Sequence, residues 1–298
     1  MDVSPLEDIV DRVLDEEALR RADIRFGLVT VESRGLKPRE LTLDEIPAGK
    51  VKDYLMASAA CFPALRARQI DGVKFLDGGY SDNMPTGLAK TMGAEELVCV
   101  DLEGVGITRP NLTGLPTTMI RSYWELGDIL HFDPDTARRN MELGYYDTLR
   151  AFGRLRGCAF AVSNDPASSV DAAAFHAKFE RVQKQVREKY PVTLTADAAL
   201  LLANMKDADL APLEAAAEDV GVSPTGYYTT HTLCDAFLAK CDQARMQSFA
   251  PLFEGSADAA RAALAALLPN TFLQALVWHT LTAPKAELLP EVNQNEDL

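Results

Sequence analysis

A short apolar strand that ends in an aspartate and two glycines constrains this chain more than any other part of its sequence. Residues 73–77, Val-Lys-Phe-Leu-Asp, have the β-branched and aromatic composition of a strand. Gly78 and Gly79 follow at once, and glycine permits a positive φ and a close approach of the backbone. The pattern therefore predicts that Asp77 is a carboxylate fixed by a tight turn at the end of a strand.

The segments on either side of this turn indicate an α/β layered sheet. Residues 23–31 are rich in β-forming side chains and predict an earlier strand. Asp82-Asn83 predicts the cap of a following helix, with Pro85 tolerated in its first turn. Residues 96–101 are apolar at successive positions, as expected of a strand that is covered on both faces. Strand, helix and strand in this order are typical of the α/β class.

The spacing alone leaves two interpretations of Asp77 open. In open α/β sheets ligand sites form beyond the carboxyl ends of the strands, so a fixed carboxylate there could act as a general base. A turn aspartate that accepts backbone hydrogen bonds would show the same pattern. The residues themselves do not decide between a catalytic role and a turn role.

Helices are expected on both sides of this region. Ser4-Pro5-Leu6-Glu7 has the signature of a capped helix start, and an apolar stripe follows that must pack against something. Residues 51–60 predict a second helix. From about residue 118 the pattern becomes helical, with one helix at 170–188 and three or four more between 195 and 281. One helix is marked by Met141, Tyr145, Leu149 and Phe152, and the expected linkers are residues 165–168 and 221–224.

The charge of the chain excludes some classes of partner. A formal net charge of -14 argues against a nucleic-acid partner, because phosphate binding needs a concentrated positive surface. The same charge disfavours electrostatic docking on anionic lipid, so any contact with a membrane surface would have to be apolar. Hydrophobic residues make up 47% of the chain, which is enough to fill a large core.

The cysteines and the first residues predict a cytoplasmic protein. The five cysteines are odd in number and form no CxxC pair, which favours reduced thiols; they are Cys61, Cys99, Cys158, Cys234 and Cys241. The chain starts with an acidic segment that has neither the basic nor the apolar region of a signal peptide. Residues 262–284 form the longest uncharged stretch of the chain, but Pro269-Asn270 interrupts it. We expect two packed helices there rather than a membrane span.

Two motifs of this sequence resemble the patatin-like phospholipases. Phe75-Leu76-Asp77-Gly78-Gly79-Tyr80-Ser81-Asp82-Asn83-Met84-Pro85 is similar to the D-G-G-x-x-D-N-x-P segment of that family. Upstream, Met56-Ala57-Ser58-Ala59-Ala60-Cys61-Phe62-Pro63 resembles the A-S-x-x-x-F-P run that precedes it there. The resemblance covers roughly residues 5–110 and extends weakly through residues 143–147.

The resemblance implies a fold and a chemistry. Members of the family hydrolyse carboxylic esters of phospholipids or simpler acyl esters with a serine–aspartate dyad, without a metal or an organic cofactor. Carried over, Asp77 is the general base, Gly78 and Gly79 shape the turn, and Asn83 braces it within a motif that ends at Pro85. The expected architecture is a partial patatin-like α/β domain at 1–115, a helical extension at 116–165 and an α-helical region at 166–298.

The sequence departs from the family pattern at the nucleophile. No serine stands in a G-x-S-x-G elbow, and the one segment with that glycine spacing, residues 153–157, has Leu155 at its centre. A glycine-rich oxyanion loop is missing as well. Ser58 and Ser81 are expected to be a packed residue and a turn residue, not nucleophiles. The oligomeric state is left open.

Three hypotheses follow from this departure. The first is a truncated family member that keeps only the aspartate, in which case the strands near Phe26 and Val98 should have lost partners. The second is an inactive remnant of the fold that binds lipid or another protein. The third is an unrelated α/β protein in which Asp-Gly-Gly is only a turn.

Two further candidate sites have simpler interpretations. His131-Phe132-Asp133-Pro134-Asp135 could suggest a metal site, but the histidines are isolated, so a helix boundary capped by Asp133 or Asp135 is favoured. Arg150, Arg154 and Arg156 could hold a phosphate group, but a solvated helix face is favoured. We therefore predict no metal site in this chain.

Overall fold

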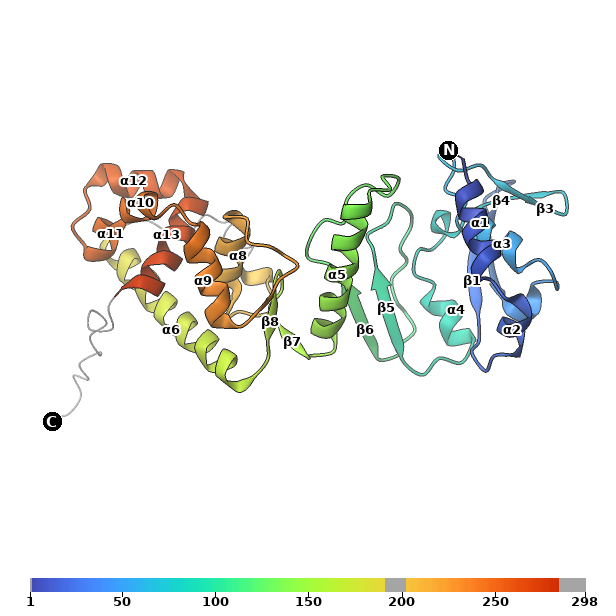
Figure 1. Ribbon diagram of the computed structural model, residues 1–298, viewed down its shortest axis with the longest axis horizontal. Helices are drawn as coiled ribbons and strands as arrows, with labels where there is room; N and C mark the ends of the chain where they lie inside the picture. Colours follow the sequence, from blue (N-terminus) through green and yellow to red (C-terminus); the bar gives the residue numbers. More distant parts are fainter. Residues whose placement is uncertain (1, 191–201, 284–298) are drawn as a thin grey trace. The chain divides into compact units, whose positions relative to one another are not determined.

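The chain folds into two compact units in the computed structural model, which describes residues 2–190 and 202–283. The first, here the α/β unit, comprises Met1–Arg121 and Gly127–Phe132. The second, here the helical unit, comprises Ser122–Leu126 and Asp133–Leu298. Figure 1 labels most of the elements of both. The α/β class expected from the sequence is confirmed, as is the mainly helical region that follows it.

The main sheet of the α/β unit is antiparallel. Its strands are β1 (Gly27–Glu32), β2 (Lys37–Thr42), β3 (Arg68–Ile70) and β4 (Val73–Asp77), in the order β2-β1-β4-β3. Strand β1 pairs with β2 on one side and with β4 on the other. The expectation that the strand near Phe26 had lost partners is therefore wrong, because β1 is an inner strand.

Apolar packing explains why β1 takes the inner position. Residues 28–31 of β1 are all buried, as expected when both faces of a strand are covered. Helix α3 (Val51–Ser58) packs against β1, where Leu28, Ile46 and Val51 form one buried cluster. Thr30 is fully buried, and its hydroxyl donates to the carbonyl of Leu76 at 2.7 Å. This bond ties β1 to β4 one residue before Asp77.

The strand near Val98 does not join the main sheet. Strand β5 (Leu97–Asp101) pairs in parallel with β6 (Thr117–Arg121) as a separate two-stranded sheet. Leu97 and Cys99 are buried, whereas Val98 and Val100 are 55% and 59% exposed. The prediction that both faces of this strand are covered is therefore wrong. Among the residues that the structure describes, β6 is the only strand paired with β5.

The N-terminal helices differ from expectation at their caps. Helix α1 (Ser4–Val13) forms as predicted, but Ser4 lies inside it and hydrogen-bonds to Asp2 instead of capping. The apolar stripe of α1 is largely exposed, with Ile9 at 47% and Val13 at 70%. Helix α2 (Glu16–Arg21) follows, and its cap is the side chain of Asp15. The remaining elements of the unit are η1 (Leu43–Glu45), η2 (Gly78–Tyr80) and α4 (Thr86–Thr91).

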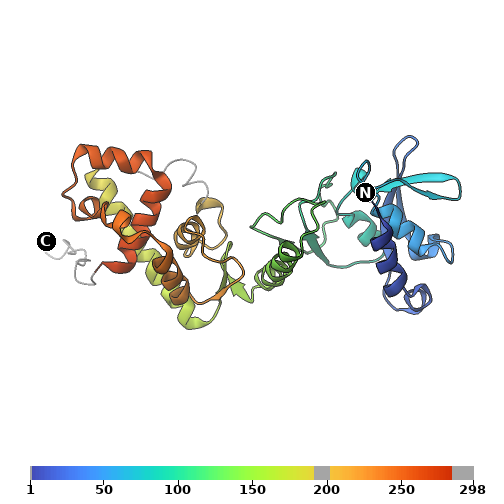
Figure 2. The ribbon, with the colours of Figure 1, turned by 45° about the horizontal axis from the view of Figure 1, so that its top comes forward.

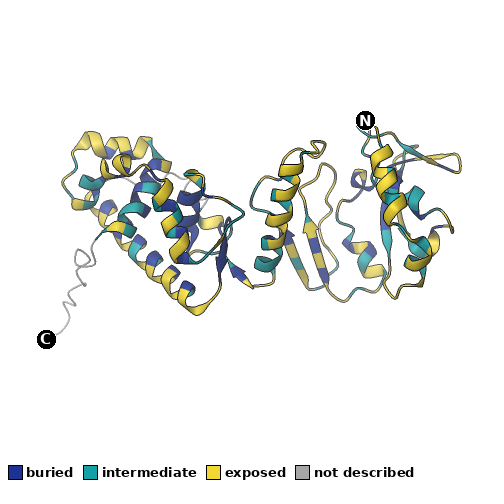
Figure 3. Ribbon diagram, viewed as in Figure 1, coloured by how far each residue is buried: buried dark blue, intermediate teal, exposed yellow. Residues whose placement is uncertain are grey.

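The helical unit is built around a continuous apolar core. Its helices are α5 (Pro134–Ala151), α6 (Pro166–Lys189), α8 (Ala211–Asp219), α9 (Thr230–Lys240), α10 (Gln243–Gln247), α11 (Ala250–Glu254), α12 (Ala259–Leu267) and α13 (Pro269–Thr282). Figure 2 shows the long α6 crossing the unit, with α9 and α13 packed against it. Buried residues of these helices form this core, and Figure 3 marks buried residues in dark blue along the ribbon. The part of the expected helical stretch at 195–201 lies outside the described residues.

Two details of the helical unit correct the sequence interpretation. Residues 165–168 are not a linker: Asp165 caps α6 by accepting the amide of Ser168 at 2.9 Å, and Ser168 is buried. In α5 the expected apolar side is exposed, with Met141 at 77% and Tyr145 at 63%, whereas Leu143 and Asp147 are buried. A capping aspartate before proline starts a helix as readily as it marks a turn, which explains the first error.

The uncharged segment near the C-terminus forms two helices as predicted. Helices α12 and α13 are separated at Leu268 and bent by 109°. Within the described part of the chain, no single helix is long and apolar enough to cross a membrane; this bent pair meets the criteria of length and composition only when its helices are taken together.

The helical unit also contains a small three-stranded sheet. Its strands are β7 (Leu155–Arg156), β8 (Ala161–Ser163) and β9 (Tyr227–Tyr228). Between β7 and β8, one carboxylate oxygen of Glu214 accepts the amides of Cys158, Ala159 and Phe160 at 2.9, 3.0 and 2.9 Å. Glu214 is completely buried, and this burial raises its pKa to about 7, although the amides and Arg150 act in the opposite direction. The group therefore couples folding of this unit to pH.

We expect Glu214→Gln to change how the stability of the helical unit depends on pH. Because the folded pKa of about 7 exceeds the unfolded value of 4.5, the folded state binds the proton more tightly. The contribution of Glu214 is then complete below about pH 4.5 and is lost as the pH rises to about 7. Its slope is at most about 1.4 kcal/mol per pH unit. The glutamine keeps an acceptor for the three amides but cannot titrate.

Calorimetry between pH 4.5 and 8 measures this effect as a difference between variants. The free energy of unfolding of the wild type should fall relative to that of Glu214→Gln up to about pH 7 and then run parallel to it. Glu188→Gln, at an exposed position on α6, serves as the control and should follow the wild type. A constant difference between Glu214→Gln and the wild type across this range would show that Glu214 does not titrate there.

Candidate functional site around Asp77

Asp77 stands where β4 ends and the backbone turns. It is the last residue of the strand, pairs with Thr30 of β1, and caps the short helix η2. Its Oδ1 atom accepts the amide of Gly79 at 2.7 Å. Among the residues that the structure describes, no donor reaches Oδ2. Asp77 therefore makes the hydrogen bond of a turn residue with one oxygen and keeps the second oxygen available.

The half-buried position of Asp77 makes its carboxylate a stronger proton acceptor. Burial raises the pKa of Asp77 above its ordinary value, and the hydrogen bond from Gly79 opposes this shift. A raised pKa moves an aspartate toward the range in which a general base works well at neutral pH. The sequence placed Asp77 at the carboxyl end of a strand in an open α/β sheet, and the strands beside β4 are antiparallel. The turn and the burial give Asp77 its properties.

Gly78 allows the turn to pass directly over β1. A Cβ atom at Gly78 would lie far inside contact distance of the carbonyl oxygen of Val29. That same oxygen accepts the hydroxyl of Ser58 at 2.7 Å. The amide of Asp77 in turn donates to the carbonyl of Ala60 at 3.1 Å. The structure therefore brings the Ala57–Pro63 run and the Asp77 turn together, although they are separate in the sequence.

The two serines of these motifs are engaged elsewhere. The Ser58 hydroxyl donates to Val29, and the Ser81 hydroxyl accepts from Arg109 at 3.1 Å. In the described part of the chain neither hydroxyl hydrogen-bonds to Asp77. Leu155, at the centre of the glycine-spaced segment, is buried in β7 of the helical unit.

Asn83 lies against the turn but does not cap a helix. Helix α4 begins at Thr86, and Pro85 precedes it without a capping side chain. Proline disfavours a helical conformation in the residue before it, which explains why the helix starts later than expected. The side-chain amide of Asn83 donates to the carbonyl of Gly104 at 3.1 Å, and its oxygen sits close to the Cα of Gly79.

Our sequence analysis missed one group of residues at this site. Residues 104–109 belong to the connection between β5 and β6, and they hydrogen-bond repeatedly to the Asp77 turn. Irregular segments like this carry no periodicity, so neither helical nor strand patterning could reveal their position. Only Gly104 and Gly106, two glycines in a short stretch, could have suggested a close approach of the backbone.

The other candidate sites take structural roles. Asp133 caps α5 by accepting the amide of Thr136 at 2.7 Å, as predicted, and the described residues contain no cluster of potential metal ligands. Arg156 lies in β7 and forms ion pairs with Asp207 and Asp209, both at less than 3 Å. The expectation of a solvated helix face is therefore wrong for Arg156.

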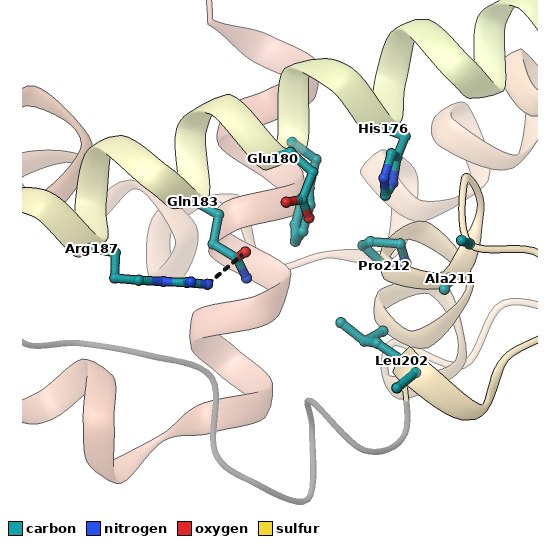
Figure 4. Close-up of a pocket in the computed structure, with 10 residues that line it drawn as sticks. His176, Glu180, Gln183, Arg187, Leu202, Ala211 and Pro212 are labelled. Atoms are coloured by element: carbon teal, nitrogen blue, oxygen red, sulfur yellow. Dashed lines mark hydrogen bonds between the residues drawn. The ribbon is translucent and has the colours of Figure 1, made fainter.

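A cavity of about 430 Å³ lies in the helical unit between α6 and α8. Figure 4 shows polar side chains of α6, including His176, Glu180 and Arg187, along one wall and Pro212 with Leu202 opposite them. None of the candidate residues of the α/β unit lines it. The cavity is therefore separate from the site at Asp77.

We expect Gly78→Ala to destabilise the α/β unit, because the new methyl group would meet backbone atoms of Val29 that cannot move aside alone. Overpacking of this kind costs about 1–3 kcal/mol or more. The matched control is Gly87→Ala in α4, where a Cβ atom meets nothing within 4 Å. It should be neutral or stabilising by up to about 1 kcal/mol. Hydrogen exchange of the β1 and β4 amides measures the stability of both variants. Equal protection in Gly78→Ala and Gly87→Ala would contradict the close approach of Gly78 to Val29.

Comparison with known proteins gives one match, to a family model. The family model for patatin-like phospholipases matches residues 1–90, which include β1, β4, Asp77 and the turn through Pro85. No curated protein and no solved structure matches the chain. Residues 1–90 of this chain are therefore similar to the patatin-like phospholipases.

Proposed function

We propose that the α/β unit carries the general base of a lipid acyl hydrolase, and that this base is Asp77. The observation that carries the proposal is the asymmetry of its carboxylate: Oδ1 is held by Gly79, whereas Oδ2 has no donor among the described residues. A base needs a fixed orientation and one free oxygen within reach of the proton it accepts. The family match supports the class of reaction, which is hydrolysis of carboxylic esters of lipids.

In this reaction Asp77 moves one proton in each half. Oδ2 accepts the proton of a serine hydroxyl while the serine oxygen attacks the ester carbonyl carbon. The tetrahedral intermediate collapses, the alcohol leaves with that proton, and an acyl-serine remains. Asp77 then accepts a proton from water, whose oxygen attacks the acyl carbonyl, and returns the proton to the serine as the fatty acid leaves. These reaction steps require no metal and no organic cofactor.

We propose that the serine of this dyad is not among the 298 residues of this chain. No G-x-S-x-G elbow occurs in the 298 residues. Ser58 and Ser81 hydrogen-bond to groups other than Asp77. We therefore propose that the chain by itself is inactive, because it supplies the base Asp77 but no nucleophile.

A second candidate function is that of a binding module without turnover. The exposed apolar side chains of α1 and β5, among them Val13 and Val100, favour it, because such surfaces are often covered by a partner. A lipid or protein ligand would contact them through apolar groups, since the net charge of -14 opposes anionic surfaces. Under either function we propose a cytoplasmic location, because reduced thiols fit it.

The decisive experiment joins the chain to the serine-bearing segment of a patatin-like phospholipase. Hydrolysis of p-nitrophenyl butyrate and labelling by a fluorophosphonate are measured for the chain alone and for the chimera. We expect neither signal from the chain alone and both from the chimera. Asp77→Asn should lower the rate of the chimera by about 10²–10⁴-fold, the usual contribution of a general base.

The matched control is Asp71→Asn. Asp71 is an exposed aspartate in the β3–β4 turn, and its ion pair with Lys50 is at the surface. This variant should keep the full activity of the chimera. If Asp77→Asn keeps it too, Asp77 is not the base. Stoichiometric fluorophosphonate labelling of the chain alone would show that it contains its own nucleophile.

A further inference from the structure

The connection between β5 and β6 makes an unusual detour to the Asp77 turn. A parallel pair needs a long crossover, and here residues 102–116 form it without a helix or a strand. Burial does not explain its path, because Val105 and Ile107 are 77% and 53% exposed. Its hydrogen bonds to the turn are therefore the interactions that fix its middle part. Residues 104–109 are named here the crossover clamp.

Ile107 exchanges two backbone hydrogen bonds with the turn. Its amide donates to the carbonyl of Gly79 at 2.8 Å, and its carbonyl accepts the amide of Asn83 at 2.7 Å. The amide of Gly79 is the donor to Asp77 Oδ1. Gly79 is thus held on both sides, by Ile107 through its carbonyl and by Asp77 through its amide.

Arg109 fixes the next residues of the turn. Its backbone amide donates to Oδ1 of Asp82 at 3.2 Å. Its guanidinium donates to the carbonyl and to the hydroxyl of Ser81, each at 3.1 Å. Ser81 and Asp82 are buried, so these contacts leave the turn little freedom to shift.

Gly106 is the position at which only glycine fits. Its φ is +145°, and a Cβ atom there would lie 2.6 Å from the carbonyl oxygen of Gly79 and 2.8 Å from the side-chain nitrogen of Asn83. Gly104, two residues earlier, has nothing within 4 Å of such an atom. The two glycines of the clamp therefore form a matched pair: a Cβ atom at Gly106 would meet the turn, and a Cβ atom at Gly104 would meet nothing.

We propose that the crossover clamp is a positioning element for Asp77: Ile107 holds Gly79, Gly106 permits this close approach, and the clamp thereby keeps the amide of Gly79 on Oδ1 and leaves Oδ2 available. The catalytic meaning of this inference rests on the proposed function, but the positioning itself does not. The clamp lies beyond the residues matched by the family model. It acts through Gly79 and touches no substrate.

The test follows the amide proton of Gly79 by NMR while Asp77 titrates. In the wild type this proton should shift with pH through its hydrogen bond to the carboxylate, and Asp77→Asn should abolish the shift. Gly106→Ala should remove most of the shift and speed exchange of the Gly79 amide, because the methyl group displaces the clamp. Gly104→Ala should keep the wild-type pH-dependent shift and the wild-type exchange rate of the Gly79 amide.

A second variant keeps the test decisive if Gly106→Ala does not fold. Arg109→Ala removes the bonds to Ser81 and should weaken the pH-dependent shift of Gly79, whereas Arg66→Ala, at an exposed position, should not. An unchanged shift in folded Gly106→Ala and in Arg109→Ala would overturn the proposal and leave the clamp a purely structural connection.

This readout needs no ester hydrolysis, so its outcome is separate from that of the proposed function. Loss of the Gly79 shift in Gly106→Ala together with full activity of the Asp77→Asn chimera would support the clamp and reject the catalytic role. An unchanged Gly79 shift in Gly106→Ala together with loss of activity in the Asp77→Asn chimera would support the catalytic role and reject the clamp.

Discussion

The hydrogen bond from the amide of Gly79 to Oδ1 of Asp77 is the interaction on which the site depends. It exists because the backbone after β4 turns at once, and the turn is possible because Gly78 has no side chain to meet Val29. The bond uses one carboxylate oxygen and fixes the direction of the other. A turn role and the proposed role as a base are therefore compatible for Asp77, since the turn would orient the base.

Glu214 shows what a buried carboxylate looks like when it has only a structural role. Both groups have a raised pKa, and burial is the main cause in each. Three amides converge on Glu214 inside a sealed core, whereas Asp77 receives one amide and remains partly exposed. A shifted pKa alone therefore does not identify a functional group. Asp77 differs from Glu214 in that its second carboxylate oxygen, Oδ2, accepts no hydrogen bond from the described residues.

The sequence predicted the local features of the site better than its surroundings. The strand, the aspartate and the glycine turn are encoded within seven residues, so composition and spacing were enough to place them. The inner position of β1 was not predictable, because strand order depends on which apolar faces meet, as Leu28 and Val51 do here. The helix start after Asn83 was missed because capping residues also bond within loops, and Pro85 delays the helix. The path of residues 104–109 follows from backbone hydrogen bonds, which leave no pattern in side-chain type.

The proposed dyad makes a geometric demand on its nucleophile. The backbone amide of Asp77 is bonded to the carbonyl of Ala60, and its Oδ1 atom is bonded to the amide of Gly79. The approach of a serine that disturbs neither bond is on the Oδ2 side, where the described residues supply no donor. An approaching segment would add the one missing bond without displacing an existing one, so the turn would not need to rearrange. A site prepared in this way loses little conformational entropy when the second partner arrives, which is the physical advantage of holding the aspartate rigidly before it has anything to activate.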